Sequence, residues 1–96
     1  MFIISLDYIA PLEQMDKHFP EHKEFLDSNY KRNIFLVSGR KVPRTGGIIV
    51  ALGESKEEIQ KIIQNDPYHK LELAKYTITE FVGSNFHPDL ARLLNQ

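Results

Sequence analysis

The chain has 96 residues, of which 42% are hydrophobic and 26% charged, and its formal net charge is −1. This composition is typical of a globular domain and lacks the basic character of nucleic-acid-binding proteins. The absence of cysteine excludes disulfides and thiolate chemistry, and no apolar run is long enough to span a bilayer. We therefore expect one domain over residues 1–96, cytoplasmic, with no nucleic-acid or membrane partner.

The first half of the chain predicts a strand, a helix and a second strand. Residues 2–9 (FIISLDYI) are rich in aromatic and branched side chains, as strands are. Residues 10–33 carry apolar side chains at helical spacing, but Pro20 lacks a backbone donor, so we expect a kink or a restart near 17–20. The apolar run at 34–38 (IFLVS) predicts a buried strand.

The second half predicts a loop, two strands and two helices. Residues 39–47 (GRKVPRTGG) have the composition of a loop, and 48–52 (IIVAL) that of a third strand. Residues 55–65 predict a helix in which Ser55 and Glu58 fit a capping box. A turn at 66–74, a fourth strand at 75–82 and a short helix from about Pro88 complete the chain.

The order β-α-β-β-α-β, followed by a C-terminal helix, predicts a ferredoxin-like α+β fold with an antiparallel sheet. Two helices would cover one face of that sheet, yet the strands carry apolar residues on both faces. A second layer is therefore needed, and another copy of the chain is the simplest one. We expect a homodimer in which the open faces of the two sheets meet.

Two residues are candidates for acid–base chemistry, although each also has a structural explanation. His22 falls between Phe19 and Leu26 on the apolar stripe of its helix, where it is either a satisfied core histidine or a functional one. Asp66 directly precedes Pro67, which favours an extended backbone there, and a simple helix-ending turn would explain it. A carboxylate next to a histidine would fix the histidine tautomer and raise its basicity.

Metal binding is a weaker alternative for the histidines. His18 and His22 have the i, i+4 spacing of two ligands on one helix, but Pro20 lies between them and the H-E-x-x-H order is absent. Only Asp66 or His69 could add a further ligand. We therefore expect His18 to be a surface residue, and we predict no metal site and no cofactor.

Three segments resemble the YciI-like (YCII-related) family: EHKEFL, VSGRKVPRTGGIIVAL and NDPYHKLELAKYTITEFV. The resemblance covers roughly residues 1–83 and rests on His22, Ser38–Gly39 and Asp66–Pro67–Tyr68. It departs at Arg40, where proline is more usual. The resemblance implies a dimeric α/β-barrel protein with a His22–Asp66 active site in a cleft.

Four further residues are predicted to bind the substrate. Ser38 would form a hydrogen bond at the pocket wall and Gly39 would give the backbone room there, although a plain turn at the end of the strand explains both equally well. Tyr68 would cover the site, or it packs in the core. Arg40 belongs to a cationic loop, which is either a solvated surface or an attraction for an anionic substrate.

Two functions remain open on these residues. One is a cofactor-free enzyme of lyase or isomerase type, in which His22 and Asp66 move a proton on a small oxygenated metabolite. The other is a binding module in which the same dimer holds a small molecule without chemistry. A cofactor-free monooxygenase is suggested by fold analogy alone.

Overall fold

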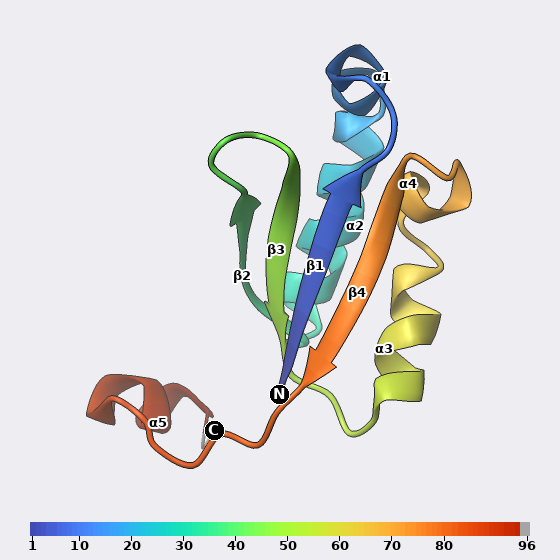
Figure 1. The fold of residues 1–96 in the computed structure, drawn as a ribbon. Coiled ribbons are helices and arrows are strands. Elements are labelled where there is room, and N and C mark those ends of the chain that lie inside the picture. Colours follow the sequence, from blue (N-terminus) through green and yellow to red (C-terminus); the bar gives the residue numbers. More distant parts are fainter. Residues whose placement is uncertain (95–96) are drawn as a thin grey trace.

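The computed structural model describes residues 1–94, which form a sheet with helices packed on one side (Figure 1). In chain order the elements are β1 (Phe2–Tyr8), α1 (Leu12–Lys17), α2 (Phe19–Lys31), β2 (Phe35–Arg40), β3 (Gly46–Ala51), α3 (Lys56–Ile63), α4 (Pro67–Lys70), β4 (Ala74–Glu80) and α5 (Pro88–Leu94). None of the helices described is both long and apolar enough to cross a membrane.

The four strands form one antiparallel sheet in the order β2-β3-β1-β4. The predicted α+β class and antiparallel sheet are therefore confirmed. The first strand lies inside the sheet, between β3 and β4, so its backbone is paired along both edges. This central position makes β1 the strand against which the helices and both neighbouring strands are aligned.

The core lies between the sheet and its helices. Alternation along β1 turns Phe2, Ile4 and Leu6 toward the helices, and all three are almost fully buried. They meet a set of apolar residues from the helices: Met15, Phe25, Ile59, Ile62 and Ile63. The apolar spacing of α3 matches its buried stripe. The first helical segment departs from its predicted stripe, because α2 buries His22, Phe25 and Asn29 and leaves Phe19 exposed.

The predicted break in the first helical segment falls at His18. This residue ends α1 and precedes α2, with φ −100° and ψ 5°. Pro20 lies in the first turn of α2, where a backbone N–H has no intrahelical acceptor and its absence costs nothing. Pro20 therefore lies at the start of a new helix, and the predicted restart is confirmed.

The loop expected over residues 39–47 is shorter in the structure. Strand β2 continues through Arg40, and β3 begins at Gly46, because Gly39 pairs with Ile48 and Arg40 with Gly47. The N–H of Lys41 then donates to the carbonyl of Gly46 at 2.9 Å. Glycine and basic residues made this segment look irregular, but cross-strand pairing extends both strands into it.

The predicted cap of α3 and the predicted helix near residue 88 are both present. Ser55 caps α3 by accepting a hydrogen bond from the Glu58 N–H at 3.1 Å. The Glu58 side chain accepts from the Glu54 N–H, so the reciprocal half of the capping box is shifted by one residue. The predicted terminal helix forms as α5, which lies apart from the sheet (Figure 1).

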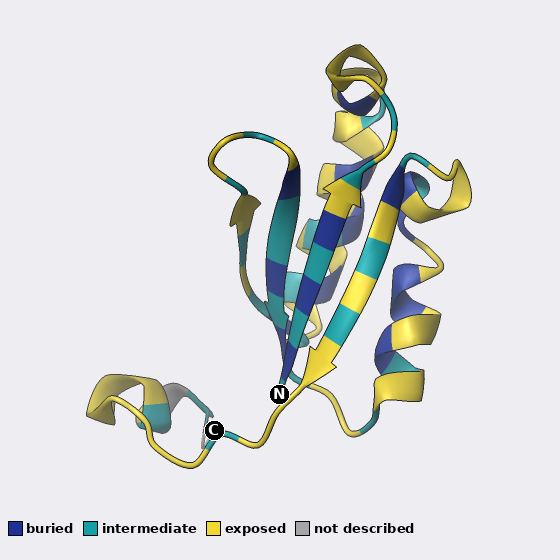
Figure 2. Ribbon diagram, in the orientation of Figure 1, coloured by how far each residue is buried: buried dark blue, intermediate teal, exposed yellow. Residues whose placement is uncertain are grey.

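One face of the sheet is covered by no helix of residues 1–94. Helices α2 and α3 lie behind the sheet in the view of Figure 1, and the opposite face is open. Cross-strand pairing aligns Ile3, Val50 and Val37 on this open face, with Ile48 next to them. These residues are half-buried or exposed (Figure 2), so the open face presents apolar surface over β1, β3 and β2.

Gly46 is required where β3 passes the central strand. A Cβ at residue 46 would lie 1.8 Å from the carbonyl oxygen of Leu6, which is backbone in a doubly paired strand. At Gly39 a Cβ would meet nothing within 4 Å. The two glycines therefore differ sharply in how much they constrain the chain.

We predict that Gly46→Ala lowers the free energy of unfolding by about 2 kcal/mol, because the backbone of β1 or β3 must shift to admit the methyl group. The matched variant Gly39→Ala should change it by no more than about 0.5 kcal/mol. Urea denaturation of both variants measures the difference. Equal effects would contradict the close approach at Gly46.

Candidate functional site

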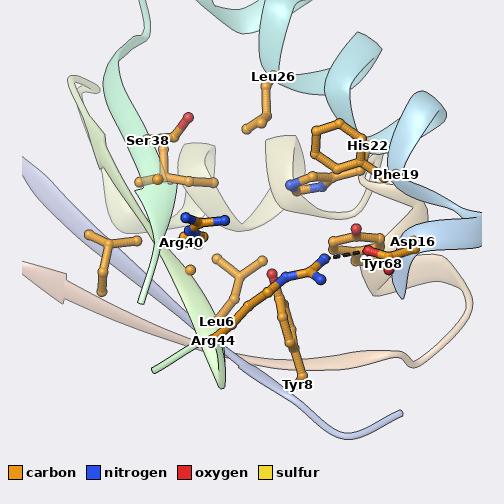
Figure 3. A pocket seen from close by; sticks show the side chains of 14 residues that line it. Leu6, Tyr8, Asp16, Phe19, His22, Leu26, Ser38, Arg40, Arg44 and Tyr68 are labelled. Atoms are coloured by element: carbon orange, nitrogen blue, oxygen red, sulfur yellow. Dashed lines mark hydrogen bonds and ion pairs between the residues drawn. The ribbon is translucent and has the colours of Figure 1, made fainter. Parts of the chain in front are cut away.

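A cavity of about 550 Å³ lies between the sheet and the first two helices. Figure 3 shows side chains from the sheet and from the helices converging on it. Its apolar walls include Leu6, Phe19, Leu26 and Ile49, and its polar groups come from Asp16, His22, Ser38, Arg40, Arg44 and the two tyrosines Tyr8 and Tyr68. Of the predicted site residues, His22, Ser38, Gly39, Arg40 and Tyr68 line this cavity.

The sixth predicted residue, Asp66, lies behind His22 rather than on the cavity wall. Nδ1 of His22 and Oδ1 of Asp66 are 2.8 Å apart, and the Asp66 side chain is fully buried. The two residues are 44 positions apart in sequence, one on α2 and the other preceding α4. The contact between His22 and Asp66, which the predicted fold allowed, is present in the structure.

Asp66 also has the structural role that its neighbour Pro67 suggested. Its backbone is extended (φ −73°, ψ 126°), and it caps α4 by accepting from the Tyr68 N–H through Oδ1 at 3.1 Å. The second oxygen, Oδ2, accepts from the hydroxyl of Tyr76. Both carboxylate oxygens are therefore occupied, as a charge buried this deeply requires.

The imidazole of His22 lies flat against Tyr68. The ring centroids are 4.0 Å apart and the planes differ by 8°. Because a carboxylate accepts at Nδ1, that nitrogen carries the proton and Nε2 of the neutral ring presents a lone pair. Among residues 1–94 every buried polar side-chain atom has a hydrogen-bond partner, whereas Nε2 of His22 has none there, so Nε2 is not buried. Because His22 lines the cavity, this nitrogen is open to it.

Tyr68 is held rigidly in that position. Its hydroxyl donates to the carbonyl oxygen of Met15 at 2.8 Å, and its ring packs edge-on against Tyr8. Burial raises the pKa of Tyr68, and the nearby Tyr8 and Asp66 add to this effect. The phenol therefore stays protonated, and the aromatic wall under His22 is fixed at both ends.

Tyr76 is a member of the site that the sequence did not identify. It lies on β4 opposite Leu6 and reaches Asp66 from the sheet side. Burial raises its pKa strongly, and the negative charge of Asp66 raises it further. Only the register of β4 against β1 reveals this contact, because a tyrosine in an alternating strand carries no other signal.

Ser38 and Gly39 occupy the cavity wall formed by β2. The Ser38 hydroxyl is 2.5 Å from that of Tyr30, near the end of α2. Gly39 has open space where a side chain would be, so a larger residue there would fill part of the cavity. Both residues line the cavity, as predicted. The hydrogen-bond partner of the Ser38 hydroxyl is a phenol and not a base that would activate a serine nucleophile.

The two arginines on the cavity wall differ in their partners. Arg44 contacts Asp16, with Nη2 and Oδ1 2.5 Å apart. This hydrogen bond lowers the pKa of Asp16 and raises that of Arg44. Arg40 has no acidic partner within 4.0 Å among residues 1–94.

His18 does not join the site. It lies at the break between α1 and α2, partly exposed, with Nδ1 3.8 Å from Glu21. In the part of the chain that the structure describes, no group of three or more histidine, aspartate or glutamate side chains is placed to hold a metal ion.

The raised pKa values of Tyr68 and Tyr76 predict how stability depends on pH. In an unfolded chain tyrosine loses its proton near pH 10. Because the folded-state pKa of Tyr76 lies above that value, the unfolded state ionises first, and stability that is present below about pH 10 is lost as pH rises beyond it.

We predict that Tyr76→Phe lowers the free energy of unfolding at pH 7 by about 2 kcal/mol, the value of a hydrogen bond to a charged group. The variant should also lose stability less steeply between about pH 9 and 11, around the ordinary tyrosine pKa of roughly 10. Denaturation series across that range test both effects. Parallel curves for the two proteins would show that Tyr76 does not carry the pH dependence.

Solved structures include one with the same fold. 5-Chloro-2-hydroxyhydroquinone dehydrochlorinase from Burkholderia phenoliruptrix, in complex with 2,5-dihydroxybenzoquinone, superimposes with a TM-score of 0.72 at 18% identity. The match covers 88% of this chain and 96% of the dehydrochlorinase chain. No curated protein sequence matches significantly. The YCII-related domain profile matches residues 1–82, and the chain therefore belongs to the YCII-related domain family.

Proposed function

We propose that this protein is a cofactor-free enzyme that transfers a proton on a small oxygenated molecule, in a reaction of lyase or isomerase type. One observation carries the proposal. A histidine whose Nδ1 is 2.8 Å from a fully buried carboxylate presents its other nitrogen to a cavity of about 550 Å³.

The mechanism assigns one role to each member of the pair. Nε2 of His22 removes a proton from a C–H or O–H of the substrate, and the imidazolium that forms is stabilised by Asp66. In an isomerisation the proton returns to a different atom of the substrate. In an elimination the electron pair of the broken bond forms a double bond, and a leaving group departs with its own pair. Such general acid–base catalysis contributes about 10²–10⁴ in rate.

The cavity suits a flat oxygenated substrate. The Tyr68 ring and the apolar side chains of Leu6 and Ile49 offer walls, while Ser38 and Arg40 offer hydrogen-bond donors. Arg40 would bind a negatively charged group. The dehydrochlorinase with the same fold binds 2,5-dihydroxybenzoquinone, which is flat and oxygenated, and this supports the substrate class without naming the substrate.

Hydrogen–deuterium exchange tests the proton transfer before the natural substrate is known. The protein would be incubated in D₂O with a panel of cyclic diketones, hydroxylated cyclohexadienones and 2-oxo acids, and deuterium incorporation followed by NMR. We predict that His22→Gln lowers the exchange rate by about 10²-fold or more, because the base is removed. Asp66→Asn should lower the exchange rate with little effect on binding. The amide oxygen of asparagine can still accept from the Tyr68 N–H at the start of α4, but a neutral amide cannot stabilise the imidazolium.

His87→Gln serves as the control, because His87 is exposed and does not line the cavity. If the active-site variants weaken binding of a panel compound and no exchange occurs in any protein, the domain is a small-molecule-binding module. Melting curves of the variants confirm that each remains folded.

We also propose that the protein is a ferredoxin-like homodimer whose sheets pack face to face as a dimeric α/β barrel. The support is the open face, on which Ile3, Val37, Ile48 and Val50 expose apolar surface that a second copy would bury. The strand order β2-β3-β1-β4 agrees with this architecture.

A charge on the open face should prevent dimer formation. We predict that Val50→Lys yields a monomer in sedimentation velocity, because the buried lysine would be unpaired. Gln60→Lys, on the exposed surface of α3, adds the same charge and should leave the dimer intact. A wild-type protein that sediments as a monomer at high concentration would overturn the proposal.

A further inference from the structure

Two arginines face one cavity, but only one of them is already paired. Asp16 binds Arg44, and Figure 3 draws this contact as a dashed line beside the cavity. The guanidinium of Arg40 lies at the same cavity, and among the described residues no carboxylate is within 4.0 Å of it. Arg40 can therefore bind a ligand directly, whereas Arg44 would first have to release Asp16.

The charges that face the cavity therefore sum to one unbalanced positive charge. Asp16 and Arg44 cancel, and Arg40 remains. Asp66 does not line the cavity, and both of its oxygens accept hydrogen bonds from other groups, so its charge is turned away from the ligand. The pKa of Asp16 is lowered by its bond to Arg44, so this residue is negative at neutral pH.

We propose that Asp16 is a specificity-determining residue that restricts the cavity to singly charged anions. A ligand with one negative group binds Arg40. A second negative group would have to displace Asp16 from Arg44 or lie beside its carboxylate, where like charges repel. The inference rests on the proposed function only in taking this cavity as the substrate site.

Asp16 can act this way without holding the fold together. Its side chain is 61% exposed, and exposed ion pairs contribute little to stability. Removing the carboxylate should therefore free Arg44 while leaving the cavity intact. Asp7 and Lys41 form a second exposed ion pair, with Oδ1 and Nζ 2.7 Å apart, and neither residue lines the cavity. This second pair supplies a matched control.

The test compares three probes built on one benzene ring at about pH 8: benzamide, benzoate and isophthalate, which are neutral, singly and doubly negative. Dissociation constants come from NMR titration of the wild type and the variants Asp16→Asn, Asp7→Asn and Arg40→Gln. The wild type should prefer benzoate, and Arg40→Gln should lose that preference over benzamide. In Asp16→Asn the affinity for isophthalate relative to benzoate should rise about tenfold, as expected for one added charge-assisted hydrogen bond.

Asp7→Asn should keep the wild-type ratio, because it removes the same charge outside the cavity. The inference is overturned if Asp16→Asn and Asp7→Asn give the same ratio, if the wild type prefers isophthalate, or if benzoate does not bind at millimolar concentration. Binding is measured without turnover, so the outcome is independent of the exchange assay. Charge selection without proton exchange would refute the proposed enzyme and leave this inference standing.

Discussion

The buried carboxylate of Asp66 is the group on which the site depends. A negative charge with no solvent contact is tolerated only when hydrogen-bond donors surround it. Here the donors come from three elements: His22 from α2, the Tyr68 N–H from α4 and the Tyr76 hydroxyl from β4. Satisfying one carboxylate thereby fixes two helices and a strand relative to one another.

The cavity wall is built on the same network. Tyr68 provides the N–H that caps α4 with Asp66, and its ring carries the imidazole that Asp66 orients. Its hydroxyl reaches the carbonyl of Met15, which connects α1 to this arrangement. The orientation of His22 and the shape of the wall beside it are therefore one structural unit, and moving Tyr68 would disturb both.

The sequence predicts those features that depend on neighbouring residues. Pro20 and Pro67 each restrict the local backbone, so the helix restart and the extended conformation at Asp66 could be foreseen. Features set by distant residues could not. Tyr76 reaches Asp66 because β4 pairs with β1 in one register, and Arg44 meets Asp16 across 28 residues of sequence. No local pattern records either contact, although the His22–Asp66 pair could be inferred by resemblance to a family.

Arg40 shows how one side chain can change the charge at the wall of a site. A proline at this position could not donate to a sheet ladder. Arginine here pairs with Gly47 at the end of β2 and carries its charge to the cavity wall. Residue 40 therefore contributes a positive charge to the cavity wall and continues the pairing of β2 with β3. Since Asp16 already balances Arg44, Arg40 leaves one positive charge at the cavity wall without an acidic partner among residues 1–94.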